Sequence, residues 1–562
     1  MKKYLFVLFF SSFLLSACDK KTNPPPSNQL PPPSNQHISV LTQHNDNTRA
    51  GLNASETELT TANVNASRFG KLFTLAVDDE VYAQPLVSGG LSISGSSHNV
   101  VFIATVNNSV YAYDGDNGTE YWMKNFTVPG MRAPNWNDMA SGWCNPYTNF
   151  TSNIGIVGTP VIDSATQSIY FVARSVSGSQ FYQHLHAVDI ATGTERPGSP
   201  VQISAQVAGT GDGNLNGIVS FDPRKNNQRQ GLALVNGIVF ISYSSHCDWN
   251  PYHGWILGYN AQTLQQTIVY NDTPSGEGGG IWQSGMGIAA DDQGSLYITT
   301  GNGTLGQGNL YGPSDNGTNE NSPNPNPSDV TNRSESAIKL TPSASTLAVS
   351  SFFTPTNYLN LNINDLDYGV MGTLLIPNSS YYFTGCKDGN LYLLNKDAMG
   401  GYSSTSNQVQ QTIPLNENLH CQPAYYHGNT KEFVYVWSEN DQLRALSFNR
   451  STNKFDNSQV VSNAQGPTGQ SGAVLSVSSN NGADGTGIVW AAYATATDAE
   501  NVKGSGILRA FDANDITKEL WNSHQNAIDF PGNYAKFSSP TIANGHVYLA
   551  TFSNQVVVYG LK

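Results

Sequence analysis

The chain has 562 residues, only 12% of them charged, and a formal net charge of −14. No Lys/Arg-rich run interrupts this acidic balance, which argues against nucleic acid as a partner. The composition is rich in Gly, Asn, Ser, Thr, Tyr and Val, which favours many short strands and turns over helices.

The first 17 residues have the form of a secretory signal. Lys2 and Lys3 precede an apolar run over 4–17, which is shorter than the ~20 residues that span a bilayer. LSAC, residues 15–18, resembles the lipobox of bacterial lipoproteins. That resemblance implies a lipidated Cys18, carrying acyl chains such as palmitate. The alternative is a plain signal peptide followed by a chance cysteine.

Residues 18–37 are rich in proline and contain the hexapeptide PPPSNQ twice. They show no apolar periodicity, and proline favours an extended chain, so we expect a semi-rigid spacer. The remainder, 38–562, would then be held at a bacterial membrane by its N-terminal lipid. We expect it in the cell envelope, facing the periplasm or the exterior, with envelope proteins as candidate partners.

A strand pattern first seen in VVFIATVNNSVYAYDGDNGTEYW, residues 100–122, recurs along the chain. An apolar strand, a short turn, an alternating strand and a second turn predict a meander of hairpins. DGDNG, residues 114–118, resembles the start of an EF-hand loop, but its place in the repeat predicts a turn between strands. The second strand of each unit ends near Asp114, Asp189, Asn260, Leu340, Asn395, Ser447, Asp512 and Gly560.

These eight returns, about 50 to 80 residues apart, are typical of the blades of a β-propeller. We therefore predict an all-β fold, a single eight-bladed propeller with four-stranded antiparallel blades, with seven blades as the alternative. The last repeat stops at VVVYGLK, before its outer strand, and FGKLFTLAV, residues 69–77, precedes the first complete unit. We expect this N-terminal strand to close the last blade. The polar insertion at 304–335 is expected to be a surface loop.

Four cysteines follow Cys18, and an oxidising compartment would permit two disulfides. Three pairings are open. The shorter separation favours Cys386–Cys421, which leaves Cys144–Cys247.

The unit strand–turn–YAYD–x–x–G–x–x–W resembles the repeat of the pyrroloquinoline quinone (PQQ) propeller superfamily over most of 65–562. That superfamily contains alcohol dehydrogenases that use the quinone with Ca²⁺. It also contains cofactor-free propellers that bind proteins, such as an outer-membrane assembly lipoprotein. The resemblance therefore implies the fold more strongly than the function.

Four positions match the dehydrogenases in chain order. Trp282 in GGGIWQSG would lie under the quinone, and Asn302 in YITTGNG would bind the metal, since its amide oxygen suits Ca²⁺. Asp367 in DLDYG matches the catalytic base, which is also a metal ligand. Lys387 in CKDGN would contact the quinone oxygens. The alternative is that these four residues have purely structural roles, since such residues are also common in blade turns and in packing between blades.

Two departures weaken the enzymatic interpretation. The stretch ARSVSGSQFYQHLHAVD, residues 173–189, lacks the glutamate ligand of the dehydrogenases, and no two cysteines are adjacent. We therefore favour a lipid-anchored binding or scaffold protein without turnover. The alternative is a divergent PQQ- and Ca²⁺-dependent dehydrogenase that oxidises alcohols or sugars.

Two other histidine-containing segments carry weaker signals. SSHCDWNPYHGW, residues 244–255, could bind a transition metal but matches no standard zinc spacing, so a structured loop over one mouth of the propeller is the better prediction. His184 and His186 lie two apart on one strand, which favours packing within a blade.

Overall fold

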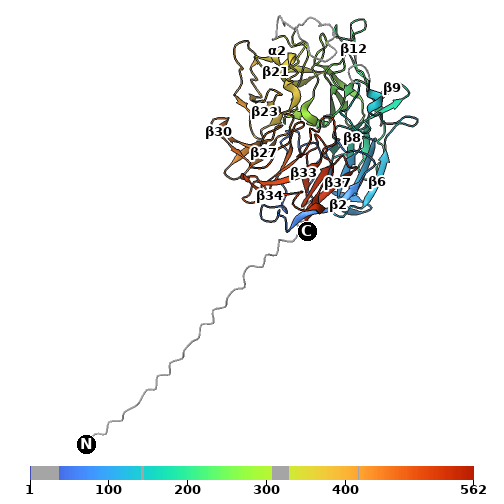
Figure 1. The fold of residues 1–562 in the computed structure, drawn as a ribbon. Coiled ribbons are helices and arrows are strands. Elements are labelled where there is room, and N and C mark those ends of the chain that lie inside the picture. Colours follow the sequence, from blue (N-terminus) through green and yellow to red (C-terminus); the bar gives the residue numbers. More distant parts are fainter. Residues whose placement is uncertain (2–36, 141–144, 307–327, 416) are drawn as a thin grey trace. The chain divides into compact units, whose positions relative to one another are not determined.

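Eight antiparallel sheets form the blades of a propeller (Figure 1). The computed structural model describes residue 1 and residues 37–140, 145–306, 328–415 and 417–562. The predicted eight-bladed fold is confirmed. The signal peptide, Cys18 and nearly all of the spacer fall outside the described residues, so those assignments stay predictions. No helix within these described ranges is long and apolar enough to cross a membrane.

Within each of the first four blades, the strands follow one another from the innermost, at the axis, to the outermost. Blade 1 is β3 (Leu86–Ile93), β4 (Ser96–Ala104), β5 (Ser109–Asp114) and β6 (Glu120–Asn125). Blade 2 is β7 (Val161–Asp163), β8 (Ser168–Ser177), β9 (Gln180–Asp189) and β10 (Val201–Gln202). Blade 3 is β13 (Asn226–Asn227) and β14 (Ala233–Val235), both paired with β15 (Ile238–Ser245), then β16 (Trp255–Asn260) and β17 (Gln266–Asn271). Blade 4 is β18 (Ala289–Ala290), β19 (Leu296–Thr299), β20 (Ala337–Ser343) and β21 (Thr346–Thr354).

The remaining blades follow the same order. Blade 5 is β22 (Leu374–Leu375), β23 (Tyr381–Gly385), β24 (Asn390–Asn395) and β26 (Gln411–Pro414). Blade 6 is β27 (Ala424–His427), β28 (Glu432–Val436), β29 (Arg444–Asn449) and β30 (Lys454–Val461). Blade 7 is β31 (Val474–Ser478), β32 (Ile488–Ala494), β33 (Gly506–Asp512) and β34 (Asp515–Asn522). Blade 8 is β35 (Thr541–Ala543), β36 (His546–Ala550), β37 (Gln555–Leu561) and β2 (Phe69–Ala76).

Short elements lie between and beside the blades. The strands are β1 (Leu52–Asn53), the hairpin β11 (Gln206–Ala208) and β12 (Ile218–Ser220), and β25 (Gly401–Tyr402). The helices are α1 (Trp136–Met139), α2 (Tyr358–Ile363), and the 3₁₀ turns η2 (Gln283–Gly285), η3 (Tyr368–Val370) and η4 (Ala527–Asp529).

The N-terminal strand closes the ring as predicted. β2 pairs antiparallel with β37, and the two lie together in Figure 1, blue beside red. Phe69 at the start of β2 packs 5.0 Å from the Trp521 ring of blade 7. Closure therefore covers a sheet edge and also joins the two ends of the chain through aromatic contacts.

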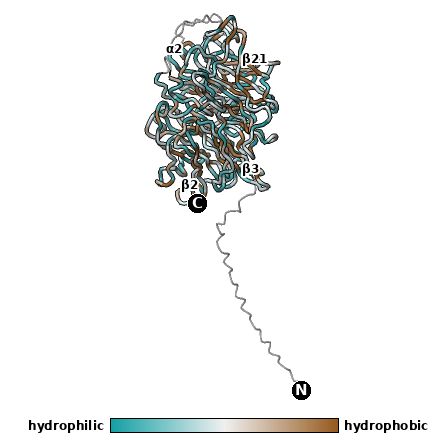
Figure 2. Tube along the Cα trace, turned by 90° about the vertical axis from the view of Figure 1, so that its right-hand side faces the viewer, coloured by the Kyte–Doolittle hydropathy of each residue, from teal (hydrophilic) through white to brown (hydrophobic). Residues whose placement is uncertain are grey.

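Apolar side chains pack mainly between blades, in eight clusters within the described part of the chain. Hydrophobic and hydrophilic residues are interspersed over the propeller in Figure 2. Trp122, the tryptophan of the first repeat motif, packs against blade 2 and donates its indole N–H to the Ile190 carbonyl at 3.0 Å. The turn at 114–118 is also confirmed: the Asp114 carboxylate accepts the N–H groups of Asp116 and Asn117.

Residues 38–56, which we call the N-terminal belt, circle the axis and contact the innermost strand of each blade in turn. The hydrogen bonds join Val40 to Val87, Leu41 to Ile162, Asn47 to Leu234 and Ala290, Thr48 to Leu375, Ala50 to Tyr425, Gly51 to Val477, and Asn53 to Ile542. Buried Arg49 donates to the Leu232 and Ile288 carbonyls, so it links blades 3 and 4 across the belt. The belt therefore runs around the axis and ties all eight blades together.

The predicted Cys386–Cys421 disulfide is wrong, because both thiols are free and buried. Cys386 packs between blades 4 and 5, whereas Cys421 packs between blades 5 and 6. The two side chains therefore lie in different interblade layers, whatever their separation in sequence. Cys247 is disulfide-bonded. Cys144, its predicted partner, lies outside the described residues.

The insertion at 304–335 is only partly a surface loop. Residues 307–327 lie outside the described part, but Asn332 to Ser336 are fully buried. Glu335 accepts the backbone N–H of Tyr368 at 2.7 Å, and the Arg333 guanidinium lies 4.0 Å from the Phe352 ring centre. The end of the insertion is therefore part of blade packing, which its polar sequence concealed.

Candidate functional site

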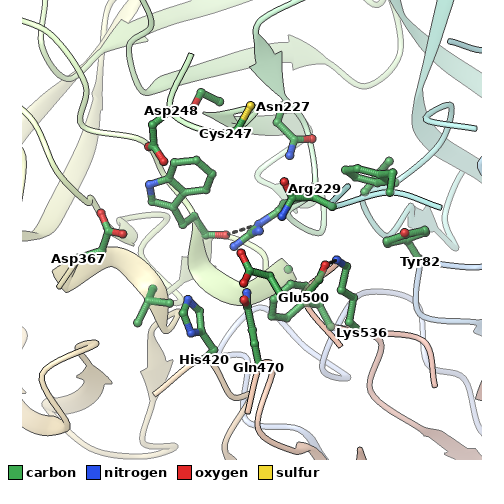
Figure 3. A pocket seen from close by; sticks show the side chains of 18 of the residues that line it. Tyr82, Asn227, Arg229, Cys247, Asp248, Asp367, His420, Gln470, Glu500 and Lys536 are labelled. Carbon is green, nitrogen blue, oxygen red and sulfur yellow. Dashed lines mark hydrogen bonds between the residues drawn. The ribbon is translucent and has the colours of Figure 1, made fainter. Parts of the chain in front are cut away.

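A cavity of about 360 Å³ lies on the axis, at the end where the innermost strands begin. Every blade contributes to its wall through the same position, four residues before the innermost strand. These residues are Tyr82, Val157, Arg229, Gly285, Val370, His420, Gln470 and Phe537. The blade repeat thus places all eight side chains at a similar height along the axis. The residue type at that position in each blade determines whether its part of the cavity wall is charged, polar or apolar. Figure 3 shows several of them pointing into the pocket.

One wall is formed by an ion-paired cluster around Lys387. Its ammonium lies 2.6 Å from Asp367 Oδ2 and 3.2 Å from Asp365 Oδ2. Asn302 donates hydrogen bonds to the same two carboxyl groups. Its backbone N–H donates to Asp367 Oδ1 and its Nδ2 to Asp365 Oδ1, both at 2.8 Å. The three segments that carry these residues follow β19, follow α2 and follow β23, so neighbouring blades 4 and 5 bring them together.

Lys387 decides which carboxyl of this wall is ionised. Burial by itself would raise the pKa of Asp367, but the Lys387 charge and the Asn302 N–H hold that pKa below its usual value. Burial and the charge of Asp367 raise the pKa of Asp365. Burial and both of these aspartates raise the pKa of Asp248, in the adjoining loop, to about 7. The carboxylate nearest the lysine is thus anionic at neutral pH, while Asp248 titrates near neutrality.

Trp282 completes this wall and packs closely against it. A Cβ on Gly301 would lie 2.3 Å from Asp367 Oδ1 and 2.8 Å from Trp282 Cδ1, so only glycine fits between them. Tyr252 packs edge-on to the indole, with ring centres 6.5 Å apart. The indole is therefore held in place beside an ionised carboxylate.

The opposite side of the cavity carries Arg229 and Lys536 (Figure 3). Burial lowers the pKa of Arg229 to about 10, and burial together with the Arg229 charge lowers that of Lys536 to about 8. Glu500 lines the same side, so the aspartate-rich wall faces two cationic groups and one further carboxyl group.

His420 lines the cavity with its ring fixed by a carboxylate. Its Nδ1 lies 2.7 Å from Glu439 Oε1. Burial and the charges of Lys387 and Arg229 lower the pKa of His420 well below its usual value. Burial and Asp498 raise the pKa of Glu439 to about 7. A neutral imidazole that is oriented by a carboxylate can accept a proton or a hydrogen bond from a ligand.

The four residues singled out in the sequence thus meet at one place, but not all of them reach the cavity. Trp282, Asp367 and Lys387 line it, whereas Asn302 lies behind Asp367. The Asn302 Oδ1 atom is buried and has no hydrogen-bond partner among the described residues. Their assigned roles towards a quinone or a metal remain predictions.

The donor set suits an organic ligand better than a divalent metal. Lys387 is already paired with the two closest carboxyl groups, and the Asn302 amide is turned to donate to Asp365. No cluster of three His, Cys, Asp or Glu side chains that could hold a metal occurs in the described ranges. By contrast, an indole wall, a lysine and an arginine match the aromatic and oxygen-bearing parts of a quinone.

The weaker histidine signals have structural explanations. His186 packs 5.1 Å from the Phe171 ring and pairs with Glu195 inside blade 2, as expected for blade packing. In the segment 244–255, His246 contacts the Tyr147 hydroxyl and His253 the Asp212 carbonyl. Cys247 and Asp248 line the cavity, so this segment forms part of its wall.

Sequence reasoning missed Arg229, His420 and Lys536. The blade register would have found the first two, because both stand four residues before an innermost strand. Such short strands are hard to place from sequence, since several contain only two or three residues. Lys536 stands one residue before the corresponding position in blade 8.

No protein-family model matches the sequence, and no curated protein sequence matches it. Solved structures do resemble it. The quinohemoprotein alcohol dehydrogenase ADHIIG from Pseudomonas putida HK5 covers 93% of this chain and 80% of its own, at 12% identity and a TM-score of 0.57. The quinohemoprotein alcohol dehydrogenase from Comamonas testosteroni has the same identity and coverage and a TM-score of 0.58. A europium-containing methanol dehydrogenase covers 93% of this chain and 98% of its own, at 10% identity and a TM-score of 0.56. The chain therefore has the eight-bladed propeller fold of the quinoprotein dehydrogenases.

Proposed function

We propose that this protein binds a compact, flat, oxygen-rich organic molecule of the quinone class in its axial cavity. The observation that carries the proposal is the wall on which Trp282, Asp367 and Lys387 meet, beside a cavity of about 360 Å³. Cavities of roughly 300–1,000 Å³ that combine aromatic walls with a few polar groups are typical small-molecule sites. For a protein that binds such a ligand without converting it, these contacts suffice and no catalytic role of the three residues is required.

PQQ is the first molecule to test. Its flat ring system would lie against Trp282, and Lys387 would donate to its carbonyl oxygens. A bound quinone would supply a two-electron acceptor. The protein's own contribution would be to orient the ligand and to exclude water from the buried wall.

A second candidate, oxidation of an alcohol or a sugar, is favoured by one observation. Asp367, held ionised by Lys387, and His420, oriented by Glu439, line the same cavity. Either group could accept the proton of a substrate hydroxyl. Ca²⁺ or another cation bound at Asp365 and Asp367 would first have to displace the Lys387 ammonium.

The test is a titration of the full-length protein, purified in detergent, with PQQ, followed by tryptophan fluorescence. We expect saturable quenching at micromolar PQQ that is lost in Trp282→Ala. Trp437→Phe, a buried tryptophan in blade 6, is the matched control and should quench normally. Quenching that survives in Trp282→Ala, or no quenching at tens of micromolar PQQ, would sink the proposal.

The same preparation separates binding from turnover. Reduction of an artificial electron acceptor with PQQ and an alcohol or sugar, lost in Asp367→Asn, would establish the dehydrogenase. Binding without reduction, with or without added Ca²⁺ or Eu³⁺, would leave a binding protein.

We also propose that Cys18 anchors the protein to a membrane of the cell envelope. The LSAC sequence and the proline-rich spacer support this. Two acyl chains would hold the protein stably, so Cys18→Ser should move it from the membrane fraction to the soluble fraction. Fractionation of cells that express each form measures this, and an unchanged distribution would rule out the lipid anchor.

A further inference from the structure

We propose that Arg229 and Lys536 form an oxyanion subsite in the axial cavity, so that its ligand carries a carboxylate or phosphate group on the side away from Asp367. The inference rests on the proposed function in one respect only, that the cavity binds a small molecule. It adds the chemical class of that molecule, and the subsite has its own test.

Lys536 is a buried cation without a carboxylate partner. Its side chain belongs to a residue that is only 6% exposed, and its ammonium donates to the backbone carbonyl of Glu500. It takes part in no ion pair with any described residue. A buried ammonium is costly unless it is paired, so a vacant ion-pair position beside a cavity indicates an anionic ligand.

Arg229 offers a second donor group to the same space. Its Nε donates to the Trp282 carbonyl at 3.2 Å, and no described residue accepts from its two terminal nitrogens. The guanidinium lies 4.8 Å from the Phe537 ring centre and 5.3 Å from that of Trp282. Two aromatic rings thus hold the planar group, which can donate two parallel hydrogen bonds to an oxyanion.

Two other buried cations in the described ranges each have several acceptors within the protein. Arg49 donates to the carbonyls of Gln43, Leu232 and Ile288, and Arg174 donates to the Asn226 carbonyl and the His246 ring. Lys536 and the half-buried Arg229 each have a single side-chain acceptor among the described residues, a backbone carbonyl. Both therefore keep donor capacity at the wall of the cavity.

A bound anion would share this side of the cavity with Glu500, which lines it together with Arg229 and Lys536 (Figure 3). The acidic groups that face Lys536 are Glu80, Asp498 and Glu500. Glu80 is already paired with Lys503, at 2.5 Å, and Arg229 repels the ammonium from the other side. Burial and this repulsion lower the pKa of Lys536 to about 8. A bound oxyanion favours the charged lysine, so binding should weaken as pH rises above that value.

The test is calorimetric titration of the full-length protein, in detergent, with succinate and separately with inorganic phosphate. We expect one molecule bound per chain, and the tighter of the two probes identifies the oxyanion as carboxylate or phosphate. Lys536→Met should weaken binding at least tenfold. Lys431→Met is the matched control, because Lys431 is an exposed lysine that also donates to a backbone carbonyl, that of Asn514; its affinity should be unchanged.

A charge-preserving variant separates the subsite from a folding defect. Lys536→Arg should retain binding, and it should lose the weakening that the wild type shows between pH 7 and pH 9.5, because arginine stays protonated. Failure of both oxyanions to bind at millimolar concentration would overturn the subsite, as would unchanged affinity in a folded Arg229→Gln, Lys536→Met double variant. Quinone binding without oxyanion binding would overturn the subsite alone. Oxyanion binding without quinone binding would overturn the quinone proposal alone.

Discussion

At the scale of single residues, Lys387 determines the chemistry of the aspartate wall. It lies between buried Asp367, which packs beside Trp282, and Asp365, whose side chain is 54% exposed. Without it, Asp367 would be a buried carboxylate with only a like-charged neighbour, and its proton would be harder to remove. An ionised Asp367 therefore depends on a residue from the neighbouring strand end rather than on Asp367 itself.

Replacing Lys387 by Met should destabilise the protein by about 3–5 kcal/mol at pH 8, because a buried ion pair loses one partner. The pKa of Asp367 is held below its unfolded value, so this contribution is present above pH ~4 and is lost as pH falls below it. Urea unfolding of Lys387→Met and wild type at pH 8 and pH 2.5 measures the difference. The gap should shrink at pH 2.5, and an equal gap at both pH values would refute the electrostatic explanation. Lys431→Met is the exposed control.

The effect of Asp248 on the free energy of unfolding should have the opposite pH dependence. Its pKa is raised to about 7, so the folded protein binds a proton that the unfolded chain has released, and stability falls as pH rises from ~4 to ~7. Asp248→Asn removes this cost and keeps an oxygen for the Tyr252 hydroxyl. We expect a gain of about 4 kcal/mol at pH 8 and none at pH 3.5. A loss of stability at pH 8 in thermal unfolding would contradict this assignment.

At the scale of elements, the N-terminal belt reaches the innermost strands of all eight blades. Residues 38–56 bond to innermost strands of all eight blades, and Arg49 joins blades 3 and 4. These strands are short, and several have only two or three residues. The belt therefore supplies hydrogen bonds to sheet edges that would otherwise face the axis unpaired.

Removing the belt should therefore unfold or severely destabilise the propeller, although no blade strand is lost. A chain starting at residue 57 is expected to show a lower thermal midpoint, by 10 °C or more, or to be insoluble. A chain starting at residue 36 keeps the belt and should unfold like the mature protein. Differential scanning calorimetry compares the two, and equal midpoints would show that the belt is dispensable.

The elements were predictable to the extent that their side chains alternate and their turns have a signature. The strands that end at Asp114, Asp189 and Asp512 follow that pattern, and closure by residues 69–76 follows from a missing outer strand. The belt is different because its bonds use mostly backbone groups, which leave little trace in sequence. The cysteine pairing failed for a related reason: which interblade layer a side chain enters depends on the three-dimensional arrangement of the blades.

At the scale of the whole molecule, eight blades converge on one cavity at a shared register. Resemblance to a known repeat located three residues of its wall, Trp282, Asp367 and Lys387, because that wall follows motifs with fixed spacing. The opposite wall is formed by Arg229 and Lys536, in segments without such motifs. Their proximity follows only from closing the ring, which places blades 3 and 8 around the same axis.

The proposal that the axial cavity binds a ligand can be tested with a crystal structure of the protein soaked with PQQ. We expect a flat ligand against Trp282, with Lys387 within hydrogen-bond distance of its oxygen atoms. Electron density for the quinone elsewhere on the molecule, with the cavity holding only water, would contradict it.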